Sequence, residues 1–193
     1  MAIRAVTDSV YYVGVDDNTL VLFENQYPIQ PMGVSYNSYV IMDEKIAVMD
    51  SVDSRAAAEW LDNVAQVLKG RQPDYLVISH MEPDHSGSIM RLVDKYPEMK
   101  LVGNAKTFTM FKQFFGTSTP SDRMVEVGEQ STLNLGAHQL QFIMAPMVHW
   151  PEVMVSYESA EKVLFSADGF GRFGAVAKFD EKADWASEAR RYY

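Results

Sequence analysis

Four side chains of the kinds that bind metal ions lie within six consecutive residues of this 193-residue chain. They are His80, Glu82, Asp84 and His85. An apolar run over 75–78 precedes them, and an extended strand would place every second side chain of the group on one face. Pro83 and Gly87 instead favour a bend, which could gather the last two ligands around a second metal position. We therefore predict a metal site at the end of a buried strand.

The ligand types limit which metals this site could hold. Two imidazoles and two carboxylates form a mixed nitrogen and oxygen set, which suits iron, zinc or manganese. The chain contains no cysteine, which excludes copper–thiolate centres and iron–sulfur clusters. The alternative interpretation is a solvated polar loop whose histidines cap the helix that follows. We favour the metal site over the polar loop, because a metal site requires several ligand residues to cluster at turn positions, as they do here.

The composition indicates a single globular domain over residues 1–193. Hydrophobic residues make up 47% of the chain, enough to bury a substantial core. A net charge of −9 would repel a phosphate backbone, so we expect no nucleic-acid partner. No apolar run approaches the roughly 18 to 20 residues that cross a bilayer, and the N-terminus does not resemble a signal peptide. We expect a soluble cytoplasmic protein that binds no membrane.

The hydrophobic pattern predicts an α/β (α+β) fold. Short β segments separated by turn residues, beginning with 10–15, predict antiparallel sheet in the first quarter of the chain. Apolar residues at helical spacing predict a helix from Ser54, as its N-cap, to Gly70. Strand and helix then alternate over 75–79, 86–95, 100–103 and 105–115. Further β segments follow up to residue 167, and a mixed sheet with helices outside it is the simplest architecture.

Two residues further along the chain add to the candidate ligands. His149 lies in a loop between two predicted strands. Asp168 ends an apolar strand and precedes Gly169, a position that suits a carboxylate bridging two metals. Each has an alternative role, His149 as a hydrogen-bonded loop residue and Asp168 as a turn former before glycine. The remaining histidine, His138, is predicted to be exposed in a hairpin turn and to bind no metal.

These motifs together resemble the metallo-β-lactamase-like domain of the flavodiiron proteins, over essentially the whole chain. The resemblance rests on His-x-Glu-x-Asp-His at a strand end, a distant His in His-Trp-Pro, and an Asp after a β-strand. It implies a metallo-β-lactamase-like αβ/βα sandwich and a di-iron, FMN-dependent reductase of oxygen or nitric oxide. Zinc hydrolases of the same superfamily carry a second His where this chain has Glu82. A carboxylate there favours iron and lowers its Lewis acidity, which shifts the chemistry from water activation to redox.

The resemblance also implies how the ligands are divided between two irons. One iron would be bound by His80, Glu82 and His149. The other would be bound by Asp84, and Asp168 would bridge both.

Two features of the second iron site stay open at this point. In the family, the residue matching His85 either binds the second iron or turns away and leaves a solvent molecule. The family also has a further histidine on that iron, beyond the position of Asp168, and this sequence has no histidine after His149. Residues 181–193 predict a helix with no stop signal. We therefore expect this to be part of a longer protein, without the flavodoxin-like domain that holds FMN.

The partners follow from the resemblance as well. It implies a small gas substrate, a rubredoxin-like protein or flavin reductase as electron donor, and either a homodimer or association with the rest of the protein. Trp150, Phe170 and Phe173 are candidates for an apolar gas pocket, with ordinary core packing as the alternative. Two other functions remain open, a zinc-dependent hydrolase of the same superfamily and a metal-poor structural or partner-binding module.

Overall fold

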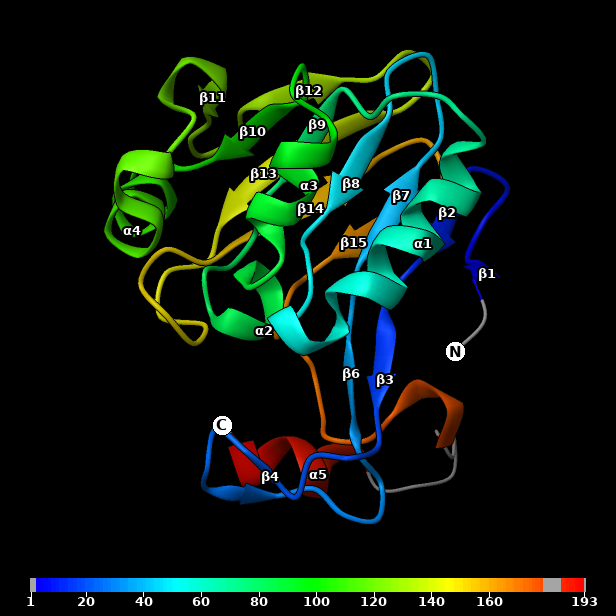
Figure 1. Ribbon diagram of the computed structural model, residues 1–193, viewed down its shortest axis with the longest axis vertical. Helices are drawn as coiled ribbons and strands as arrows, with labels where there is room; N and C mark the ends of the chain where they lie inside the picture. Colours follow the sequence, from blue (N-terminus) through cyan, green and yellow to red (C-terminus); the bar gives the residue numbers. More distant parts are fainter. Residues whose placement is uncertain (1–2, 179–184, 193) are drawn as a thin grey trace.

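The structure is a computed structural model that describes residues 3–178 and 185–192, drawn in Figure 1. The strands are β1 (Arg4–Ala5), β2 (Val10–Tyr12), β3 (Val15–Asp17), β4 (Leu22–Phe23), β5 (Tyr27–Pro28), β6 (Val34–Tyr36), β7 (Tyr39–Ile41), β8 (Ala47–Met49), β9 (Tyr75–Val77), β10 (Lys100–Gly103), β11 (Met124–Glu126), β12 (Thr132–Asn134), β13 (Gln139–Met144), β14 (Met154–Glu158) and β15 (Val163–Phe165). The helices are α1 (Ala57–Leu68), α2 (Pro83–Ser86), α3 (Ile89–Lys95), α4 (Ala105–Phe115) and α5 (Trp185–Tyr192). Of the predicted C-terminal helix, residues 181–184 and 193 lie outside the described residues.

The larger sheet has seven strands in the order β1-β2-β7-β8-β9-β10-β11. Its first strands pair antiparallel, as the turn residues predict. From β8 to β11 the strands are parallel. The carboxyl ends of β8, β9 and β10 therefore meet at one edge, where polar side chains from separate segments can converge.

A second sheet packs against the first. Strands β12 to β15 form an antiparallel four-stranded meander. Buried apolar residues from both sheets form one cluster, with Val77 and Val102 on the larger sheet and Phe142 and Met154 on the smaller. Two facing sheets replace the single mixed sheet that the pattern alone favours. The sandwich implied by the family resemblance is the better description.

Helices cover the outer face of the larger sheet (Figure 1). In α1, Trp60, Val64 and Leu68 are buried in the same cluster as residues of α3 and α4. The prediction that Ser54 caps this helix is wrong. The side chain of Asp53 accepts from Arg55 N instead, and a 3-10 turn precedes Ala57.

One predicted strand divides because of a glycine. A Cβ on Gly14 would lie 2.2 Å from the carbonyl oxygen of Tyr36, so only glycine allows this close approach of the two backbones. Strand β2 stays in the large sheet, whereas β3 pairs with β6 in a separate ribbon. Figure 1 shows this ribbon extending toward β4 and α5 at the lower end of the molecule. Among the described residues, no helix combines the length and apolar character needed to cross a membrane.

Candidate metal centre

The predicted ligand segment follows β9 at the carboxyl edge of the large sheet. His80 comes three residues after the strand, Glu82 is the residue before α2, and Pro83 occupies the first turn of that helix. Proline suits this position because the first helical N–H needs no partner within the helix. Asp84 and His85 therefore lie in a short helix, and the bend predicted at Pro83 is confirmed. The helix predicted over 86–95 begins later, at Ile89.

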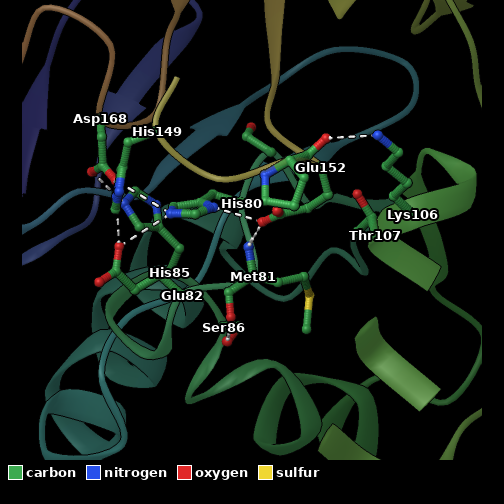
Figure 2. A network of polar contacts seen from close by, with 12 residues as sticks. His80, Met81, Glu82, His85, Ser86, Lys106, Thr107, His149, Glu152 and Asp168 are labelled. Atoms are coloured by element: carbon green, nitrogen blue, oxygen red, sulfur yellow. Dashed lines mark hydrogen bonds and ion pairs between the residues drawn. The ribbon is translucent and has the colours of Figure 1, made fainter. Parts of the chain in front are cut away.

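Four of the predicted ligands converge on one position (Figure 2). They are His80, Glu82, His149 and Asp168, and one ligand atom of each lies within 4.8 Å of all the others. The Oε2 atom of Glu82 is 3.1 Å from His80 Nε2 and 2.9 Å from His149 Nε2. The Oδ2 atom of Asp168 is 3.2 Å from His149 Nε2 and 3.4 Å from His80 Nε2. We name this group the first cluster.

Asp168 also belongs to a second group. Asp84, His85 and Asp168 bring their ligand atoms together within the same 4.8 Å limit. His85 Nε2 lies 2.9 Å from Asp168 Oδ1 and 3.7 Å from Asp84 Oδ2. One oxygen of Asp168 therefore faces the first cluster and the other faces this second cluster. This arrangement suits a carboxylate that bridges two cations.

Charge compensation within the clusters shifts several pKa values. Burial would lower the pKa of His80, but its hydrogen bonds to Glu152 and Glu82 raise that pKa to about 9. Burial raises the pKa of Asp84 to about 6, against the opposing charge of His85. The pKa of Asp168 falls below its usual range despite burial, because the charge of His85 and bonds from both His149 and His85 favour the carboxylate. The residues form a tightly coupled acid and base network.

Two buried atoms of the second cluster have no hydrogen-bond partner among the described residues. They are Asp84 Oδ1 and His85 Nδ1. A buried polar group without a partner costs free energy, and an ionised carboxylate is well placed to bind a cation. Together with three imidazoles and three carboxylates from the two clusters, this is a donor set that fits a pair of metal ions.

Sequence reasoning missed three acidic residues beside the clusters. Glu152 Oε1 lies 2.7 Å from His80 Nδ1, and Asp50 Oδ1 accepts from Ser79 N at 2.6 Å. Close approach to Glu82, with burial second, raises the pKa of Glu24 to about 7. Only Asp50 gave a usable signal, because it directly follows β8, whose carboxyl end lies beside that of β9.

His138 contradicts its prediction as an exposed residue. It is only 6% exposed, and both its backbone N and its Nδ1 lie 2.7 Å from Asp43 Oδ2. Its Nε2 faces Glu161 Oε2 at 3.7 Å. Three turns meet here, so a residue that looks exposed in its own hairpin is covered by the other two. It belongs to neither cluster, and its exclusion from the metal ligands stays a prediction.

Among the cavities that adjoin the clusters, two are lined by aromatic residues predicted for a gas pocket. One of about 80 Å³ is lined by Phe23, Phe173, Asp84, His85 and Asp168, among others. A wider one of about 510 Å³ is lined by Trp150, Glu24 and Glu82, among others. Of the three aromatic residues predicted for a gas pocket, Trp150 and Phe173 line these cavities. Phe170 does not, and it is 70% exposed.

Comparison with known proteins decides the family. Residues 34–191 match the family described as ODP family beta lactamase. The chain belongs to that family. The predicted resemblance is confirmed, because the matching proteins include ones named as flavodiiron proteins.

Individual relatives are similar in both sequence and fold to this member of the ODP family. A nitric oxide reductase from Moorella thermoacetica is 31% identical over 98% of the chain, which spans 48% of that protein. The rubredoxin oxygen:oxidoreductase from Desulfovibrio gigas superposes with a TM-score of 0.90 at 30% identity, covering 99% of this chain and 48% of that one. The flavodiiron protein from Giardia intestinalis gives 0.84 at 32% identity, covering 99% and 44% respectively.

These comparisons confirm the predicted metallo-β-lactamase-like fold of this ODP-family chain. The chain spans about half the length of the curated relatives it matches.

Proposed function

We propose that this chain is the metal-binding part of a di-iron oxidoreductase, which reduces oxygen to water, nitric oxide to nitrous oxide, or both, with electrons from FMN. The observation that carries the proposal is the pair of ligand clusters joined at Asp168, each facing one of its two carboxylate oxygens. A single metal would not need a carboxylate placed in this way.

The residues of the chain would divide the two irons between them. His80, Glu82 and His149 would hold one, and Asp84 and His85 the other. Asp168 would bridge both. This includes His85 among the ligands, because its Nε2 faces Asp168 and Asp84. When bound, the two irons supply the one-electron steps that reduction of a diatomic gas requires.

Other residues prepare the site for a small substrate. The cavity of about 80 Å³ has room for small molecules only. Phe23 and Phe173 supply apolar walls, with ring centroids 5.7 Å apart. The rest of the lining includes the polar side chains of Asn37, His85 and Arg172. The small size of the cavity therefore favours a small substrate.

The electron donors are proposed from the relatives. Those relatives include proteins named flavorubredoxin, rubredoxin-oxygen oxidoreductase and diflavin flavoprotein. We propose FMN as the immediate electron source and a rubredoxin-like protein or a flavin reductase as the source for FMN. Assembly as a homodimer, a place in a longer protein and a cytoplasmic location stay predictions.

The zinc hydrolase is the less favoured alternative. Glu82 replaces a histidine of the hydrolase pattern, and its Oε2 lies between the imidazoles of His80 and His149. Carboxylate oxygen at this position favours iron over zinc. The curated relatives are named as reductases, which supports the oxidoreductase.

Anaerobic reconstitution with Fe²⁺ tests the proposal. We expect two irons per chain, and consumption of nitric oxide or oxygen when reduced FMN is added to the reconstituted protein. A matched sample reconstituted with Zn²⁺ should consume neither gas. Stoichiometric zinc uptake in preference to iron, with ester or thioester hydrolysis, would overturn the oxidoreductase. A melting temperature indifferent to both metals would favour the structural module.

A further inference from the structure

Glu152 is a buried carboxylate that belongs to neither cluster and lies behind His80. Its Oε1 is 2.7 Å from His80 Nδ1 and accepts a hydrogen bond from Met81 N at 2.9 Å. Neither the His80 nor the Glu152 side chain has any exposed surface. Figure 2 shows Glu152 on one side of His80 and Glu82, His149 and Asp168 gathered on the other. The imidazole is thus held between a carboxylate and the first cluster.

The contact with Glu152 fixes which nitrogen of His80 is available to a metal. A carboxylate only accepts hydrogen bonds, so Nδ1 must carry the proton. In the neutral imidazole that a metal binds, Nε2, which faces Glu82 and Asp168, then presents its lone pair to the first cluster. A carboxylate behind a metal-binding imidazole also raises the basicity of the ring. Glu152 thereby sets both the tautomer and the donor strength of His80.

The backbone of Glu152 is also bonded to a neighbouring element. The Nδ2 atom of Asn104 donates to the Glu152 carbonyl oxygen at 2.6 Å, while Asn104 Oδ1 caps α4 by accepting from Lys106 N and Thr107 N. The Trp150 ring packs perpendicular to the His80 ring, with centroids 5.2 Å apart. The four residues 149–152 thus provide a ligand, a packing surface and the carboxylate behind His80. A ligand held in this way pays little entropy when metal binds.

His85 in the second cluster lacks such support. Its Nδ1 is 3.5 Å from Asp50 Oδ2, too long for a hydrogen bond, and has no partner among the described residues. Asp50 directs its other oxygen to Ser79 N at 2.6 Å. The Nδ1 atoms of His80 and His85 therefore each face a carboxylate, that of Glu152 and that of Asp50 respectively. Only His80 is hydrogen-bonded to the carboxylate that it faces.

We propose that Glu152 is a positioning residue that orients His80 and strengthens iron binding at the first cluster selectively. The proposal rests on the proposed di-iron function. It places the tighter iron with His80 and the weaker iron with His85, and it assigns part of this difference to one carboxylate that touches no metal ligand other than His80.

Glu152→Gln tests the proposal, because the amide keeps the shape of the side chain and removes its charge. Anaerobic Fe²⁺ titration of the full chain against a competing chelator would resolve two binding steps. We expect the tighter step to weaken by about 10- to 100-fold and the weaker step to stay unchanged. Visible absorption of the Co²⁺-loaded chain should shift as well, since it reports ligand orientation. A purely structural role would leave both readouts unaltered in the folded variant.

Glu158→Gln provides a matched control, because Glu158 ends strand β14, which begins two residues after Glu152. Glu158 is fully buried and accepts from Ala160 N and Glu161 N, both at 2.7 Å, with no histidine involved. This variant should leave both iron steps unchanged even if it melts at a lower temperature. Equal loss of iron in the two variants would overturn the positioning role.

If Glu152→Gln does not fold, a second variant, Asn104→Asp, still tests the proposal. Asn104→Asp retains the acceptor that caps α4 and removes the donor to the Glu152 carbonyl, so we expect a smaller weakening of the tighter step only. An unchanged tighter step in every folded variant, with two irons bound by the unmodified chain, would overturn this inference alone. Failure of the unmodified chain to bind iron would instead overturn the proposed function.

Discussion

The two ends of strand β8 each place an aspartate against a buried histidine, and only one end could hold metal. Asp50 follows the strand and lies near His85, in a region where six candidate ligand side chains converge. Asp43 precedes the strand and bonds His138. Among the described residues, one further carboxylate, that of Glu161, lies near this histidine, at 3.7 Å. A buried histidine bonded to a carboxylate is therefore insufficient evidence of a metal site. Convergence of several ligand atoms on one position is the distinguishing feature.

Among the substitutions considered at the two ends of β8, Asp168→Asn should have the largest effect on iron content and activity. A neutral amide would no longer balance two cations, so we expect loss of at least one iron per chain and a fall in gas reduction of about 100-fold or more. Iron analysis and nitric oxide consumption measure both quantities. Asp43→Asn is the matched change at the other end of β8 and should retain two irons. Two irons and full activity in the Asp168 variant would contradict the bridging role.

Glu82→His should change the metal preference of the first cluster without removing a candidate ligand. It recreates the ligand pattern of the zinc hydrolases, and we expect the ratio of zinc to iron affinity to rise by about tenfold. Competition between the two metals for the apo-protein measures that ratio. The same ratio in the variant and the unmodified chain would show that Glu82 does not select iron.

The stability of the fold in acid should depend on Asp43, which precedes β8 and bonds His138. Burial would raise the pKa of Asp43, but bonds from the backbone and side chain of His138 lower it to about 2. A lowered folded-state pKa contributes stability above the usual value of 3.8, and this contribution is lost as pH falls from 3.8 toward 2. Asp43→Asn should therefore lose about 1 kcal/mol of unfolding free energy at pH 7 and less at pH 2. Urea unfolding at both pH values measures this, and an equal loss at the two would refute it.

The smallest effect on the metal centre should come from His138→Gln. We expect the melting temperature to fall by about 2 to 4 °C, as for a loss of about 1 kcal/mol in a domain of this size. Iron stoichiometry should be unchanged, because His138 contacts no cluster residue. Loss of iron in this variant, with the fold intact by circular dichroism, would show that the two ends of β8 are coupled.

Local sequence signals predicted the regular elements best. Helix α4 and strand β13 match their predicted bounds, because Asn104 caps the helix strongly and the strand alternates along most of its length. The strand over 10–15 was predicted unbroken, since only the distant carbonyl of Tyr36 makes Gly14 the point of division. The helix cap at Ser54 was wrong because Asp53 caps a 3-10 turn over Ser54–Ala56, which precedes the helix.

The candidate ligands were predictable for a different reason than the residues behind them. Metal ligands must be of a few types and must cluster, which made His80 to His85 conspicuous within one segment. Glu152 reaches His80 across 72 positions of sequence, and no local pattern distinguishes it from a surface glutamate. His138 was misjudged because its burial depends on three turns meeting. Tertiary convergence, which a single sequence does not display, accounts for both errors.

Iron K-edge X-ray absorption of the Fe²⁺-loaded chain would show directly whether two irons lie side by side. We expect two irons per chain and an iron neighbour at about 3.5 to 4 Å, the separation of bridged two-metal sites, and loss of that neighbour in Asp168→Asn. Iron atoms without a metal neighbour in the unmodified chain, at full occupancy, would contradict a bridged pair.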